Sequence, residues 1–193
     1  MKKYCYWLLI CLLSVVISLS CKGQFNDVEK TYKNEITITN IDSGDLFYFE
    51  IRKGGGSGYI SAVEKIKGNK KEYGIIIELS YISFNNSIYD TKIYVNYDEL
   101  ESLINAIDYI SDEKNLGSDF KGYNETTYTT KEGLRISTFF DSKKKERKYS
   151  IRNASSISSE AILLFDDKSI LTEFKEIIIK NKLKIEKIKK VIF

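Results

Sequence analysis

The spacing of apolar residues along this chain changes from a period of two to a period of about 3.6, and this change occurs twice. Runs such as "EITITN" and "DLFYFEI" have the apolar content and alternation of strands. In "YDELESLINAIDYIS" the apolar positions recur every three or four residues, which predicts a helix at about 97–111. Strand-like runs follow it, and helical spacing returns at about 166–182. Two blocks of antiparallel strands, each followed by a helix, predict an α+β fold with an antiparallel β-sheet and two helices.

Turn signals divide the first block into separate strands. The alternating runs on either side of Asp42-Ser43-Gly44 are typical of a β-hairpin. Further strands are expected at about 58–66, 72–82 and 88–95. The run "GGGSG" lacks the lysine and hydroxyl residue that complete a phosphate loop, so it predicts a flexible loop rather than an anion site.

The two halves of the chain, 35–116 and 117–193, share this order of strands and helix. An aromatic residue and two acids precede each helix, as in Phe165-Asp166-Asp167, where acids satisfy free backbone N–H groups. Either a degenerate duplication or the same capping chemistry used twice explains the similarity. The order resembles, in topology only, the whirly and PUR-type nucleic-acid modules, and no residue of those families is carried over.

The first twenty residues predict a signal peptide, because Lys2 and Lys3 precede an apolar run that is too short to span a bilayer. The box Ser18-Leu19-Ser20-Cys21 resembles the end of bacterial lipoprotein leaders, although Ser18 stands where leucine is usual. The resemblance implies lipid attachment at Cys21 and a protein of the bacterial cell envelope, periplasmic or surface-facing and held on a membrane. A polar tether at 21–34 and a single domain at 35–193 would follow. Cleavage after Ser20 or Gly23 would instead give a soluble secreted protein.

Charge and composition exclude several kinds of function. Beyond Gln24 the chain carries 27 basic and 27 acidic residues, and this balance argues against a nucleic-acid partner. The chain has no histidine, and its three cysteines, Cys5, Cys11 and Cys21, lie in or at the end of the leader. An imidazole base and a His–Cys zinc site are therefore excluded from the mature domain. We expect no enzyme activity, no metal and no cofactor.

The charges are unevenly divided along the chain. Residues 24–142 have a net charge of −7, and residues 143–193 have a net charge of +7. The C-terminal segment is basic and amphipathic if helical, and its candidate surface-binding residues are Lys184, Lys187, Lys189 and Lys190. Such a helix binds an anionic membrane or a partner's groove, or it docks on its own acidic domain, which the charge division favours. A strand at 183–185 is the structural alternative.

Two tyrosines in a threonine-rich stretch, Tyr123 and Tyr128, are the other candidate surface for binding a glycan or a protein. Together these features predict an exported envelope protein with a non-catalytic binding domain and an envelope protein as its partner. The alternatives are a small secreted hydrolase that uses carboxylates or a serine–lysine pair, and a purely structural envelope component. A flat apolar or aromatic patch would favour the binding domain, and a cleft lined by paired acids would favour the hydrolase.

Overall fold

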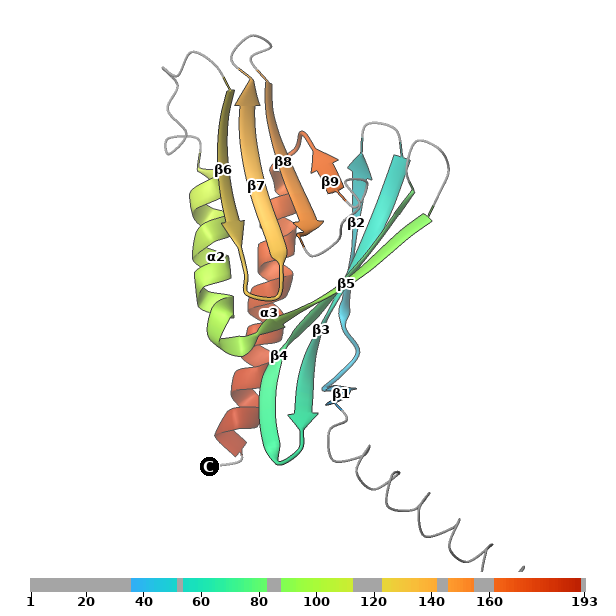
Figure 1. Ribbon diagram of the computed structural model, residues 1–193, viewed down its shortest axis with the longest axis vertical. Coiled ribbons are helices and arrows are strands. Elements are labelled where there is room, and N and C mark those ends of the chain that lie inside the picture. Colours follow the sequence, from blue (N-terminus) through green and yellow to red (C-terminus); the bar gives the residue numbers. More distant parts are fainter. Residues whose placement is uncertain are drawn as a thin grey trace, which may run out of the picture. The chain divides into compact units, whose positions relative to one another are not determined.

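The computed structural model describes six stretches of the chain (Figure 1): 36–51, 54–82, 88–112, 123–141, 146–154 and 162–191. The predicted signal peptide, the tether and Cys21 lie outside these residues. The chain divides into two compact units, Met1–Thr37 with Ile66–Lys71, and Ile38–Lys65 with Glu72–Phe193. The described residues of the first unit are few, and the second unit contains the hydrophobic core.

The order of elements confirms the α+β class. The described part of the first half contains β1 (Ile36–Asn40), β2 (Asp45–Ile51), β3 (Gly54–Lys67), β4 (Lys70–Ile82), β5 (Ile88–Asn96) and α2 (Tyr97–Ser111). The described part of the second half contains β6 (Tyr123–Thr129), β7 (Leu134–Asp141), β8 (Glu146–Asn153), β9 (Ile162–Phe165) and α3 (Ser169–Val191). Strands followed by a helix therefore occur twice, as the change of period predicts.

The first sheet differs from the prediction at its edge. Its order is β1-β3-β4-β5, with β2 also paired to β3. The hairpin predicted around Asp42 is wrong, because β1 and β2 do not pair with each other. Both strands instead pair with β3, and the connection between them is fixed by a hydrogen bond from Ile41 N to Ala62 O of 2.9 Å.

The glycine-rich run explains this arrangement. Residues 54–58, predicted as a flexible loop, form the start of β3 and pair antiparallel with β2, with Gly58 opposite Phe47. A Cβ at Gly58 would overlap the Phe47 ring, so the absence of a side chain leaves room for that ring. Phe47 is 1% exposed, and burial of its ring offsets the low strand propensity of glycine.

The second sheet is antiparallel throughout, in the order β6-β7-β8-β9. A tight turn joins β6 to β7, and Gly133 in this turn has a φ of 93°, which glycine adopts without strain. The turn is closed by hydrogen bonds between the backbones of Thr130 and Leu134 and from Gly133 N to Thr130 O. The strand-like runs expected between the two helices are therefore strands, and they form this sheet.

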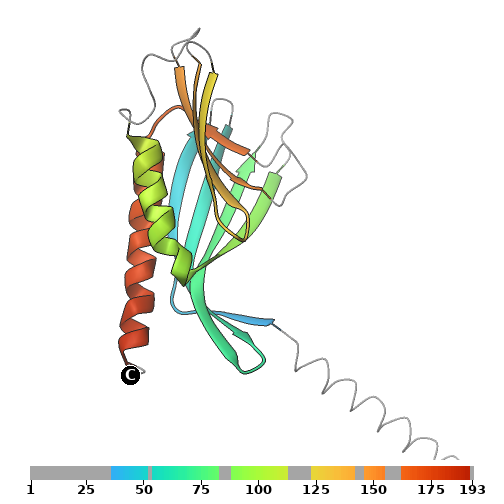
Figure 2. The ribbon, with the colours of Figure 1, turned by 60° about the vertical axis from the view of Figure 1, so that its left-hand side comes forward.

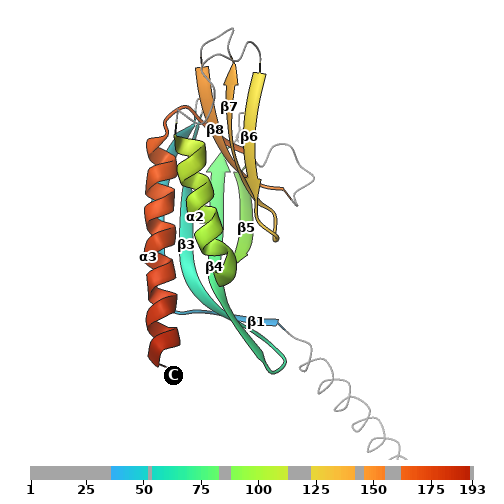
Figure 3. The same cartoon turned by 90° about the vertical axis from the view of Figure 1, so that its left-hand side faces the viewer.

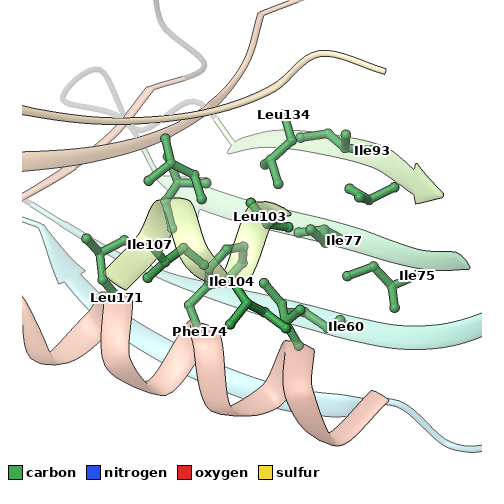
Figure 4. Close-up of a cluster of buried hydrophobic side chains, with 14 of the residues drawn as sticks. Ile60, Ile75, Ile77, Ile93, Leu103, Ile104, Ile107, Leu134, Leu171 and Phe174 are labelled. Atoms are coloured by element: carbon green, nitrogen blue, oxygen red, sulfur yellow. The ribbon is translucent and has the colours of Figure 1, made fainter. Parts of the chain in front are cut away.

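One cluster of buried side chains draws on both sheets and both helices (Figure 4). Helix α2 contributes Leu103, Ile104 and Ile107, which its periodicity places on one face. Helix α3 contributes Leu171, Phe174, Ile178 and Ile185. Helix α3 begins later and ends later than the predicted 166–182, and the alternative of a strand at 183–185 is wrong. The reason is that its buried stripe continues one turn beyond Asn181, to Ile185.

The two helices run side by side (Figures 2 and 3). Ion pairs cross between them, from Lys175 Nζ to Asp108 Oδ1 at 2.6 Å and from Lys182 Nζ to Glu101 Oε2 at 2.9 Å. Side chains also cap both helices, since Asn96 Oδ1 accepts from Asp98 N at 3.1 Å and Asp167 Oδ1 accepts from Ser169 N at 2.8 Å.

Candidate functional site

The basic helix α3 contacts the first sheet at the carboxylate of Asp45, at the start of β2. Lys180 Nζ donates to Asp45 Oδ1, and Lys184 Nζ lies 3.0 Å from Asp45 Oδ2. Lys184 also pairs with Asp42 Oδ2 at 2.9 Å, in the segment between β1 and β2. The structure thus has the intramolecular arrangement that the charge division favours, with Lys184 bound to its own domain.

Asn181 lies at the centre of this contact and is fully buried. Its Oδ1 accepts from Ala62 N of β3 at 3.0 Å. Its Nδ2 donates to Asp45 Oδ2 at 3.1 Å and to Ile177 O at 3.0 Å. Ala62 lies just beyond the part of β3 that pairs with β2. The Asn181 side chain therefore satisfies the Ala62 N–H, a backbone donor that β2 does not reach.

The charges in this contact shift one another's pKa values. Burial raises the pKa of Asp45, but hydrogen bonds and charge attraction from Lys180 and Lys184 outweigh burial and hold it below its usual value. For Lys184 burial acts to lower the pKa, and the contacts with Asp42 and Asp45 outweigh it and raise the value. The contact therefore stabilises the ionised form of both groups.

A second contact involves Tyr97 at the start of α2. The Lys189 ammonium lies 4.0 Å from the centre of the Tyr97 ring, a favourable cation–π distance. The Tyr97 hydroxyl donates to Glu186 Oε1 at 3.3 Å. Burial, and then the negative charge of Glu186, raise the pKa of the Tyr97 hydroxyl. Lys189, a predicted surface-binding residue, is therefore also engaged within the domain.

The remaining predicted residues do not form one surface. Lys187 and Lys190 are exposed on the last turns of α3. Tyr128 is half-buried and packs against the core, and burial followed by the nearby Glu99 charge raises the pKa of its hydroxyl. Nothing is described of the Tyr123 side chain or of Cys21.

An apolar surface that the sequence analysis missed lies on the first sheet. Leu46 is 52% exposed and Tyr48 is 71% exposed, whereas Phe47 between them is buried. We call Leu46 and Tyr48 the outer patch. Its signal in the sequence is that "LFYF" is apolar at every position, so both faces of β2 are apolar.

The strand that carries the outer patch is held in place by its pairing with β3 and by a side-chain hydrogen bond. Leu46 lies opposite Tyr59 of β3 in the register of the sheet. The hydroxyl of Tyr59 accepts a hydrogen bond of 2.6 Å from Gly44 N, just before β2. Because the support is a paired strand held by such contacts, Leu46 and Tyr48 are presented without the ordering cost that a flexible loop would carry on binding.

Other kinds of site are not seen in the described residues. No group of three or more His, Cys, Asp and Glu side chains there is arranged to hold a metal ion. In the same stretches, no helix has the length and apolar content to cross a membrane. No protein-family model matches the chain, and no curated protein matches it either.

Proposed function

We propose that this chain is an exported protein of the bacterial cell envelope, held on a membrane through lipid at Cys21, and that its α+β domain is a non-catalytic binding module. The leader supports export and the anchor, because it ends in a box similar to that of lipoprotein precursors. The outer patch supports the binding role. The partner that fits this surface is another protein of the envelope.

The observation that carries the proposal is the exposure of Leu46 and Tyr48 beside each other on one face of a strand. Tyrosine and large aliphatic side chains are typical of the centres of protein interfaces, where few residues supply most of the affinity. Burying such a side chain contributes about 1.5–3 kcal/mol. Nothing in the domain's own core requires Leu46 or Tyr48, since Phe47 on the opposite face of β2 packs against Phe174 of α3.

Site-specific photo-cross-linking in a native-type host tests this role. A photoreactive phenylalanine analogue at position 48 should give a discrete adduct with one envelope protein. The matched control is position 109 on α2, because Tyr109 is also an exposed tyrosine, at 52%. A second variant, Leu46→Ser, should abolish the adduct at position 48 while the domain remains folded, because Leu46 is already half-exposed. Equal cross-linking at positions 48 and 109, or an adduct insensitive to Leu46→Ser, would contradict the proposal.

A further inference from the structure

The outer face of the second sheet carries polar rows that the proposed function does not use. Alternation along β8 places Tyr149 and Ile151 in the core, so Lys148, Ser150 and Arg152 lie on the opposite face, where Ser150 is buried and the other two are partly exposed. The same reasoning places Arg135 and Ser137 of β7 on that face, since Leu134 and Ile136 are in the core; Arg135 is partly exposed and Ser137 is buried.

The register aligns these residues across the strands. Thr127, Ser137 and Ser150 form one row across β6, β7 and β8, and the Thr127 and Ser137 hydroxyls are 2.9 Å apart. The next row holds Thr129, Arg135 and Arg152. The result is a row of hydroxyls beside a row with two guanidinium groups.

Arg135 and Arg152 lie directly opposite each other, although like charges in that position destabilise a sheet. Arg135 Nε donates to Thr129 Oγ1 at 3.1 Å, and no acid pairs with either guanidinium among the described residues. Arg152 Nε is buried and has no hydrogen-bond partner there. By contrast, Lys148 on the same face lies 3.6 Å from Glu146 Oε2. Two cations with an unsatisfied buried donor therefore face each other without an anion.

We propose that this pair of arginines binds a tetrahedral oxyanion, a phosphate group, on the outer face of the second sheet. A phosphate monoester carries close to two negative charges at neutral pH, which matches two guanidinium groups better than a single carboxylate does. Its oxygens accept from both guanidinium groups, and a small rotation of the Arg152 side chain turns Nε toward them. The bound anion removes the like-charge repulsion and satisfies the unpaired N–H.

The site is independent of the outer patch. Its residues come from β6, β7 and β8 of the second sheet, whereas the outer patch is on β2 of the first sheet. Failure of one proposal therefore leaves the other standing, and variants of the two sites can be compared in the same chain.

The chain has only four arginines, so their side-chain Nε–Hε signals in a ¹H–¹⁵N NMR spectrum are readily assigned with single Arg→Lys variants. Inorganic phosphate, titrated at constant ionic strength with chloride, should shift the signals of Arg135 and Arg152 along one saturating curve. Arg147, which lies over the Phe140 ring on the other face of the sheet, should not respond. Arg152→Gln should weaken phosphate binding by about tenfold, because it removes a charged donor.

Lys92→Gln is the matched control, since it removes one positive charge from an exposed ion pair with Glu78 on the first sheet. It should leave phosphate binding unchanged. Shifts that are linear and equal for all four arginines, or an Arg152→Gln variant that binds phosphate like the parent, would overturn the proposal. The source of the phosphate is tested by competition, in which vesicles of phosphatidic acid or of phosphatidylcholine are added to the protein with bound inorganic phosphate. Competition by the first alone identifies a lipid headgroup, and no competition identifies a phosphate free in solution.

Discussion

At the scale of single residues, Asn181 shows how one polar side chain sets the position of a helix. It occupies a place in the buried stripe of α3 where an apolar residue would be expected, between Ile178 and Ile185. Its amide bonds to Ala62 N of β3, to Asp45 of β2 and to Ile177 O of its own helix. An apolar residue at this position would fill the space but leave the Ala62 N–H unsatisfied, which is costly for a buried group.

We therefore expect Asn181→Ala to lower the free energy of unfolding by about 2–3 kcal/mol, because it leaves buried polar partners unpaired. Urea unfolding followed by far-UV circular dichroism measures this change in the free energy of unfolding. Asn105→Ala is the control, since Asn105 is exposed on α2 and alanine has the higher helix propensity. Equal effects of the two substitutions would show that the hydrogen bonds of Asn181 contribute nothing.

At the scale of elements, ion pairs connect the C-terminal helix α3 to β2 and to the segment that precedes β2. Asp45 receives Lys180 and Lys184, and Lys184 also pairs with Asp42. Asp45 and Lys184 are largely shielded from solvent, with side chains 16% and 20% exposed. Removing one partner from such a contact leaves the other charge partly desolvated, so these ion pairs matter more than exposed ones.

The pH dependence of stability follows from the lowered pKa of Asp45. Its folded value lies below the ordinary 3.8, so its contribution to stability is present above pH 3.8 and is lost as pH falls through the folded pKa. Asp45→Asn should therefore destabilise the protein at neutral pH, by an amount that shrinks on acidification below the ordinary value. Urea midpoints of both proteins at neutral pH and at about pH 3 measure this. A difference between the two urea midpoints that is the same at both pH values would refute this prediction.

Asp108→Asn provides the matched control for that experiment at neutral pH. Asp108 also accepts from a lysine of α3, Lys175 at 2.6 Å, but its side chain is 56% exposed. Solvent screens such a pair, so its loss should change stability by less than about 1 kcal/mol. Comparable losses in the two variants would mean that burial of Asp45 adds nothing to the contact.

At the scale of the whole molecule, local patterns predicted the elements well and their pairing less well. The helix at 97–111 matches α2, because its apolar spacing and its acidic first turn are local features. The hairpin around Asp42 failed because β2 pairs with a glycine-rich strand whose role depends on the Phe47 ring packed across it. Asn181 and the Arg135–Arg152 pair were not predictable either, since both depend on contacts between distant segments.

The proposed anchor at Cys21 would determine where the domain's surfaces act, and the intact mass of the mature protein tests it directly. The mature protein purified from a native-type host should begin at Cys21 and carry the added mass of a diacyl or triacyl modification. Cys21→Ala should lack that mass and should no longer fractionate with membranes, because stable anchoring depends on the acyl chains. A chain that begins unmodified at Cys21 or Gln24 would contradict the anchor and would make the protein a soluble secreted one. The cross-linking experiment at Tyr48 would then apply to a partner reached by diffusion, since the outer patch does not depend on how the chain is held.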